Sequence, residues 1–253
     1  MVTMTIWWVG AVLEILVLVR GFRERLFGRF PIFYGYLLFV TIDDVLRMAV
    51  YRWFPTYYDP VYWVTQFISL AVGSGIIFEI YRVALRAFPG AARMARYLLL
   101  LVFGAIFART LAMPSGDLIE RLASGSLILE RNLRIVQALA ILTLVSLFLW
   151  YAIPFGKNLK GILIGYGLFV GISVLQFALW YYKWEPIRSV WSNAEAVSYL
   201  VVLGIWTKTL WSFQAAPELQ PENRFEQDYE LIVASTREQF RRTLARLGWA
   251  VRA

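Results

Sequence analysis

The sequence predicts an all-α protein, a polytopic bundle of seven membrane-spanning helices followed by a helical tail. The first observation is composition: of the 253 residues, 60% are hydrophobic and 17% are charged, whereas soluble domains average about 45–50% apolar and about 25% charged residues. The second is that long apolar runs recur along the chain. The third is that aromatic residues gather near the ends of these runs, as in the interfacial belts of membrane proteins. Too little polar surface remains to cover a water-soluble globule.

Seven apolar runs approach the length that a membrane requires, since a hydrocarbon core about 30 Å thick needs roughly 20 helical residues. They span residues 4–19, 31–51, 60–85, 97–113, 135–153, 161–182 and 195–211. The first and fourth are short, but Arg and Trp side chains at their ends can reach the interface. The first run has no basic region before it and no cleavage site after it, so we expect it to remain as a helix. Short loops predict that successive helices pack antiparallel in one bundle.

Basic residues favour one orientation. Ten lie in alternate loops: Arg20, Arg23, Arg25, Arg29, Arg82, Arg86, Arg93, Arg96, Lys157 and Lys160. The opposite loops carry six, with several acids among them: Arg52, Arg121, Arg131, Arg134, Lys183 and Arg188. Because cytoplasmic loops carry the excess of Lys and Arg, we expect the N-terminus outside and the C-terminus inside. The expected location is a bacterial inner (plasma) membrane.

The composition changes at residues 214–221, which separates a membrane domain (1–213) from a cytoplasmic tail (214–253). Apolar residues of the tail recur at helical spacing: Phe225, Tyr229, Ile232, Phe240, Leu244, Leu247 and Val251. Arg237, Arg241, Arg242 and Arg246 lie beside them. Such a basic amphipathic helix either lies on an anionic lipid surface or binds a cytoplasmic protein partner through residues 222–252.

Several function classes are disfavoured. The chain has no Cys and no His, which removes disulfides, thiol nucleophiles and the usual ligands of haem, copper and catalytic zinc. We therefore expect no cofactor and no metal, and we do not expect an enzyme. The net charge of +8 indicates topology and affinity for anionic lipid. It does not favour nucleic acid, because the basic residues are scattered among loops.

Charged residues inside a bilayer are costly and are therefore candidate functional residues. Asp43, Asp44 and Arg47 share the second run, at a spacing that lets one guanidinium reach both carboxylates. Arg109 of the fourth run should lie at a similar depth. So should the polar side chains of Gln66, Glu130, Arg134, Gln137 and Glu195. This pattern predicts a polar ligand pocket facing outward, with aromatic walls from Trp7, Trp8, Tyr62, Trp63, Trp180 and Tyr199. The alternative is a set of ion pairs that only fix helix packing.

Two further patterns indicate packing. Gly161 and Gly165 lie on a face of the sixth run roughly opposite to Gly167 and Gly171, so we expect this helix to pack between two others. At the cytoplasmic side, Glu79 with Arg82 and Glu14 with Lys208 lie at helix ends, where structural clasps are expected.

Three segments carry a resemblance: FEIYRVALRAFPGAARMAR, ERNLRIVQALAILTLVSLFLWY and GILIGYGLFVGISV. Across residues 32–206 the chain resembles a group of uncharacterised multi-spanning membrane proteins common in acidobacterial genomes. The resemblance implies a free-standing inner-membrane protein and carries over no functional residue. The leading hypothesis is a receptor or sensor that binds a small or lipidic ligand near Asp43, Asp44, Arg47 and Arg109. The alternatives are a transporter or channel that uses the buried charges, and an assembly subunit that recruits a partner through its tail.

Overall fold

In the computed structural model, residues 2–112, 118–151, 153–181, 185–214 and 224–250 are described, and every regular element among them is helical. The α-helices are α1 (Val2–Arg23), α2 (Pro31–Trp53), α3 (Tyr58–Ala84), α4 (Pro89–Leu111), α5 (Leu118–Trp150), α6 (Lys157–Tyr181), α7 (Glu185–Thr209) and α8 (Arg224–Ala250). Short 3-10 turns, η1 (Leu26–Gly28) and η2 (Pro55–Tyr57), lead into α2 and α3. The all-α prediction is confirmed.

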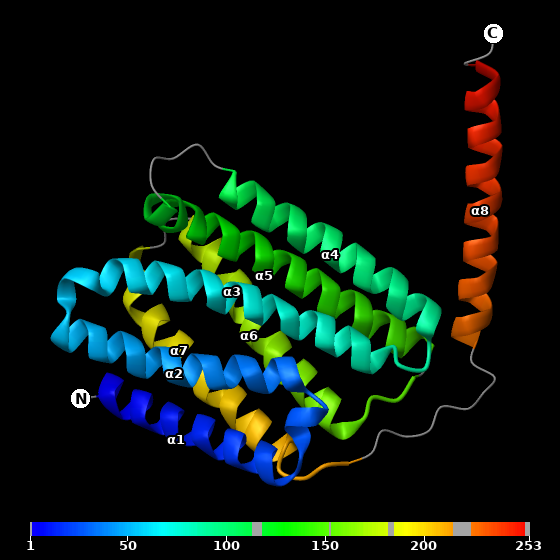
Figure 1. Ribbon diagram of the computed structural model, residues 1–253. Helices are drawn as coiled ribbons and strands as arrows, with labels where there is room; N and C mark the ends of the chain where they lie inside the picture. Colours follow the sequence, from blue (N-terminus) through cyan, green and yellow to red (C-terminus); the bar gives the residue numbers. More distant parts are fainter. Residues whose placement is uncertain (1, 113–117, 152, 182–184, 215–223, 251–253) are drawn as a thin grey trace.

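Helices α1 to α7 form one bundle in which successive helices run in opposite directions (Figure 1). Each helix packs against its neighbour in sequence, and α1 also packs against α7. Helix α3 is the most central, since it contacts α2, α4, α5 and α6. The predicted antiparallel packing of sequence neighbours is therefore confirmed.

Four helical segments of the described residues are long and apolar enough to cross a membrane: Pro55–Ala84, Pro89–Leu111, Ile128–Trp150 and Lys157–Leu179. Val197–Thr209 is apolar but shorter. Helix α2 has the length, but three charged residues, Asp43, Asp44 and Arg47, lie close together in it. Large apolar side chains such as Leu101 and Leu142 point out of the bundle, which suits a hydrocarbon surrounding. The chain is thus a membrane protein.

Three helices begin eight or more residues earlier than the apolar runs predict. Helix α4 begins at Pro89 rather than at residue 97, α5 at Leu118 rather than at 135, and α7 at Glu185 rather than at 195. Proline suits the first turn of a helix because its fixed φ is already helical and its missing N–H is not needed there. Glu, Arg and Leu, abundant before residue 135, are strong helix formers. The assignment of several bases to loops is therefore wrong: among them, Arg121, Arg131 and Arg134 lie within α5, and Arg188 lies within α7.

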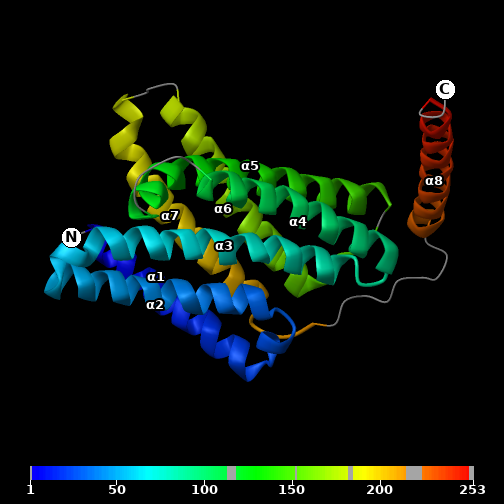
Figure 2. The same cartoon turned by 45° about the horizontal axis from the view of Figure 1, so that its top comes forward.

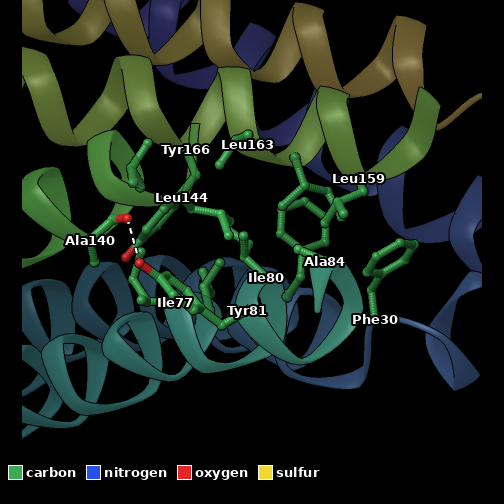
Figure 3. Close-up of a cluster of buried hydrophobic side chains, with 14 of the residues drawn as sticks. Phe30, Ile77, Ile80, Tyr81, Ala84, Ala140, Leu144, Leu159, Leu163 and Tyr166 are labelled. Atoms are coloured by element: carbon green, nitrogen blue, oxygen red, sulfur yellow. Dashed lines mark hydrogen bonds between the residues drawn. The ribbon is translucent and has the colours of Figure 1, made fainter. Parts of the chain in front are cut away.

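The core between α3, α5 and α6 is filled by large apolar side chains (Figure 3). Ile77 and Ile80 of α3 and Leu144 of α5 are almost fully buried there. The Tyr81 hydroxyl donates a hydrogen bond to the carbonyl oxygen of Ala140 at 2.7 Å, which ties α3 to α5.

Helix α6 packs between α5 and α7, as its glycines predict. A Cβ atom at Gly165 would collide with the indole of Trp206 on α7, whereas Gly167 faces Ile141 of α5. Glycine at position 165 therefore allows close approach of α6 and α7.

Two helix ends are capped by side chains from other helices. Glu79 of α3 accepts the backbone N–H groups of Ile32 (3.0 Å) and Phe33 (2.7 Å) at the beginning of α2. Asn158 of α6 donates to the carbonyl oxygen of Thr209 at the end of α7 (3.0 Å) and accepts the N–H of Gln214 (2.8 Å). Both contacts satisfy backbone groups that a helix end leaves without partners.

Helix α8 runs across the direction of the bundle, beside the end where α3 finishes and α4 begins (Figures 1 and 2). The Tyr151 hydroxyl, next to the end of α5, donates to Oδ2 of Asp228 at 3.0 Å. The Tyr229 ring lies against Gly90, where a Cβ atom would come within 2.6 Å of it. The predicted tail helix is confirmed. The side chains of Phe225, Phe240, Leu244 and Leu247, and all of Val251, lie outside the described residues.

Candidate functional site

Arg47 joins α2 to α3. Its Nη2 atom lies 2.8 Å from Oδ2 of Asp43, one helical turn earlier on α2. Its Nε donates to Oγ1 of Thr65 on α3 at 3.0 Å, and its guanidinium lies 4.5 Å from the centre of the Tyr62 ring. The predicted contact between Asp43 and Arg47 is present. It is a part-buried, charge-assisted pair whose orientation is fixed from the neighbouring helix.

The contacts continue from α3 to α5 through the side-chain amide of Gln66. Arg47 also donates from Nη2 to Oε1 of Gln66 at 3.4 Å. The other end of that amide, Nε2, donates to Oε2 of Glu130 on α5 at 3.4 Å. Glu130 in turn pairs with Arg134 one turn later, at 3.5 Å. These distances exceed the usual range of about 2.7–3.2 Å for N–H···O hydrogen bonds, so each contact is weak.

The same chain of contacts ends deep in the bundle. Arg134 donates to Oε1 of Gln137 at 3.2 Å, and Gln137 donates to the hydroxyl of Ser74 on α3 at 3.4 Å. We call the eight connected side chains, Asp43, Arg47, Thr65, Gln66, Ser74, Glu130, Arg134 and Gln137, the polar network. It links α2, α3 and α5.

Arg134 is, with Asp43, one of the two most deeply buried charges of the polar network: 7% of its surface is exposed, against 6% for Asp43. Its guanidinium lies 4.6 Å from the centre of the Phe169 ring on α6. Within the described residues, Nε of Arg134 and Oδ1 of Asp43 are buried and make no hydrogen bond. Among the described residues, the network therefore keeps one buried donor and one buried acceptor without a hydrogen-bond partner.

The other two predicted site residues occupy different surroundings. Asp44 is half-buried beside Asp43, and its carboxylate is repelled by the carboxylate of Glu14 on α1. Arg109 is exposed on α4, a helix that packs against α3 and α5. The structure thus brings Asp43, Asp44 and Arg47 together on α2 and leaves Arg109 exposed on a different helix, α4.

The predicted aromatic wall is present in part. Around Arg47, the rings of Tyr58 and Tyr62 stack with centres 6.1 Å apart, and Tyr62 meets Trp63 edge to face at 4.9 Å. Tyr199 instead lies at the boundary of α1 and α7, and Trp8 is exposed. The side chains of Trp7, Trp180 and Glu195 lie outside the described residues.

A second buried carboxylate joins α1, α2 and α7. Glu14, 2% exposed, accepts hydrogen bonds from the hydroxyls of Tyr199 (2.6 Å) and Thr41 (2.9 Å). The predicted clasp with Lys208 is wrong, since the carboxylate of Glu14 is held by these two hydroxyls and Lys208 is exposed. The predicted clasp of Glu79 with Arg82 is present at 3.3 Å, although the stronger contacts of Glu79 are with α2.

Thr65 and Ser74 are the functional candidates that the sequence does not single out. Serine and threonine are frequent between membrane helices, so neither residue type stands out in an apolar run. The only signal in the sequence is their position relative to Gln66. A polar face of α3 that contains Gln66 would also have to contain Thr65 and Ser74.

Comparison of the chain with protein-family models, with curated proteins and with solved structures gives no match. The described residues hold no group of three or more acidic side chains that could bind a metal ion. What the polar network can do chemically follows from its charges: a guanidinium and carboxylates beside aromatic rings can hold a polar or amphiphilic molecule.

Proposed function

We propose that this protein is a receptor or sensor of a bacterial inner membrane. All seven helices α1 to α7 span the bilayer, with the N-terminus outside and α8 in the cytoplasm. A small or lipidic ligand enters from the outer face beside Asp43, Asp44 and Arg47, with Arg109 on the same outer half. Ligand binding shifts α5, and this shift reaches α8.

The orientation is supported by where the bundle gathers its bases. Because successive helices alternate in direction, the end of α1, the end of α3 and the beginning of α6 meet at one end of the bundle (Figure 1). That end carries all ten bases of the richer loop set, among them Arg23, Arg86 and Lys157. An excess of Arg and Lys is typical of the cytoplasmic side.

The sensor role is supported chiefly by two contacts of α5. In its first half, Glu130 and Arg134 belong to the polar network. At its end, Tyr151 contacts Asp228 of α8. The intervening 21 positions of helix span roughly 30 Å at about 1.5 Å per residue. A ligand that competes for Arg47 removes the contact of Gln66 with Arg47. The Gln66 amide is then free to reorient and release Glu130, which joins α3 to α5.

A pair of spin labels tests this coupling. The chain contains no Cys, so Leu149→Cys on α5 and Ser235→Cys on α8, both exposed, provide the only labelling sites. In Arg47→Ala the absent guanidinium imitates ligand competition, and we expect the distance distribution between the labels to shift or broaden. Arg131→Ala is the matched control, since Arg131 is an exposed base of α5. A distribution in Arg47→Ala identical to that of Arg131→Ala would contradict the sensor role.

Transport is the second candidate, because the buried carboxylate of Glu14 and the polar network offer groups for an ion path. The core argues against it. Below Ser74, the buried side chains of Ile77, Ile80 and Leu144 fill the space between α3 and α5. Both carboxylate oxygens of Glu79 are engaged by backbone N–H groups of α2. A continuous polar path through the inner half would require these groups to separate.

A further inference from the structure

A groove of about 970 Å³ lies between α8 and the inner halves of α4 and α5. Its walls are mostly apolar: Leu98 and Leu99 of α4, Leu147 of α5, and Ile232 and Val233 of α8. Its volume is at the upper end of the range of small-molecule sites, about 300–1,000 Å³. It is separate from the polar network, which lies towards the opposite end of the bundle.

The groove is open to the surroundings of the bundle. Met94 and Leu98, which line it, are 57% and 60% exposed. They belong to Pro89–Leu111, one of the segments apolar enough to span a membrane. A groove whose wall is the outer surface of spanning helices faces the lipids of the bilayer. We therefore expect lipid acyl chains to fill it.

Two arginines line the groove on α8. Arg237 and Arg241 lie one and two turns beyond Val233, and within the described residues neither makes an ion pair. Glu238 also lines the groove, but its carboxylate is paired with Arg242 at 3.0 Å. Two guanidinium groups therefore remain for an anionic ligand.

We propose that this groove binds a phospholipid with an anionic head group from the inner leaflet. The acyl chains lie along Leu98, Leu99 and Leu147, and the phosphate binds Arg237 and Arg241. The crosswise direction of α8 (Figure 2) suits a helix that lies in the plane of the membrane interface. The lipid thereby joins α8 to the bundle, in addition to the contacts of Tyr151 and Tyr229. This site does not depend on the sensor role.

A lipid fits better than a protein partner. A protein segment in this groove would have to place its backbone beside the hydrocarbon-facing side chains of α4, where unpaired polar groups are costly. A phospholipid presents only methylene groups there and keeps its charge at Arg237 and Arg241. Each basic residue near an anionic surface contributes about 1 kcal/mol.

Native mass spectrometry of the full chain in detergent tests the head-group preference. Phosphatidylglycerol and phosphatidylcholine with identical acyl chains are added in equal amounts, and the ratio of the two bound lipids is measured. Arg237→Gln with Arg241→Gln should reduce the preference for phosphatidylglycerol by about tenfold or more, because two charges are lost. The control, Arg25→Gln with Lys160→Gln, removes two exposed charges at the same end of the bundle but from different segments of the chain, and it should leave the ratio unchanged.

A second pair of variants tests the acyl-chain site. Thr143 of α5 lines the groove, whereas its exposed neighbour Leu142 does not. Thr143→Trp should fill the groove and reduce retention of both lipids several-fold, and Leu142→Trp should not. Equal lipid ratios in the two double variants, or equal retention in the two tryptophan variants, would overturn the proposal. Photo-crosslinking from position 232 to a protein, with lipid retention unchanged, would overturn it in favour of a protein partner on α8.

Discussion

The phenolic oxygen of Tyr199 lies 2.6 Å from Oε1 of Glu14, so one hydrogen bond joins α7 to α1 across 185 positions of sequence. The second oxygen of the same carboxylate accepts the Thr41 hydroxyl at 2.9 Å, which adds α2. One buried side chain thus holds the first, second and last helices of the bundle together. Because the carboxylate is shielded from water, it has few alternative partners if either hydroxyl is removed.

Removing the Tyr199 hydroxyl should destabilise the bundle. We expect Tyr199→Phe to lower the free energy of unfolding by about 0.5–2 kcal/mol, the range for hydrogen bonds between membrane helices and to charged groups. Unfolding in mixed micelles, followed by circular dichroism, measures the change. The matched control is Tyr97→Phe, since Tyr97 is 65% exposed on α4. Equal stability of the two variants would show that the contact of Tyr199 with Glu14 does not hold the helices together.

Glu79 should contribute more to the free energy of unfolding than its ion pair with Arg82 alone would. Glu79→Ala leaves the N–H groups of Ile32 and Phe33 without their acceptor, and each buried, unpaired group costs about 1–3 kcal/mol. Arg82→Gln removes only the charge partner, whose side chain is 50% exposed, and should change stability by less than about 1 kcal/mol. The same unfolding assay compares the two variants. A larger loss in Arg82→Gln would contradict capping of α2 as the main role of Glu79.

The close approach of α6 and α7 should depend on Gly165. In Gly165→Ala the new methyl group meets the Trp206 indole, a large, almost fully buried side chain. Overpacking of this kind destabilises by about 1–3 kcal/mol. Gly171→Ala, on the same helix, meets no atom within 4 Å and should be neutral or slightly stabilising. Thermal unfolding in detergent distinguishes the two, and equal midpoints would place Trp206 elsewhere in the folded protein.

The helices and one contact of the site could be predicted from the sequence, because both depend on local spacing. Apolar runs mark the helices, and positions 43 and 47 fall on one helical face whatever the fold. The beginning of α5 could not be found in this way, since its charged first turns look the same in a loop as in a helix extended beyond the hydrocarbon. For this reason the sequence places Arg134 both among the loop bases and among the polar side chains inside the bilayer, and the structure supports only a position within a helix.

The rest of the polar network depends on packing between distant segments. Gln66 meets Glu130 only because α3 lies against α5, and a single apolar pattern does not fix which helices become neighbours. The cap of α2 is similar: its beginning at Phe30 has no side-chain cap of its own. The missing acceptor is supplied by Glu79, 46 and 47 positions away from the groups it binds. Sequence proximity offers no signal for such a pair.

The orientation can be tested with reporters at two places. A green fluorescent protein fused after Ala253 should fluoresce, and alkaline phosphatase there should be inactive, because both outcomes report the cytoplasm. Alkaline phosphatase inserted in the turn at Pro55–Tyr57 should be active, since that turn lies at the opposite end of the bundle. Substituting Arg23, Arg25 and Arg29 by Gln should lower the fraction of correctly inserted chains, because the excess of bases in this loop favours its retention inside. An active phosphatase after Ala253 in the unsubstituted chain would reverse the orientation and move Asp43 and Arg47 to the inner half of the membrane.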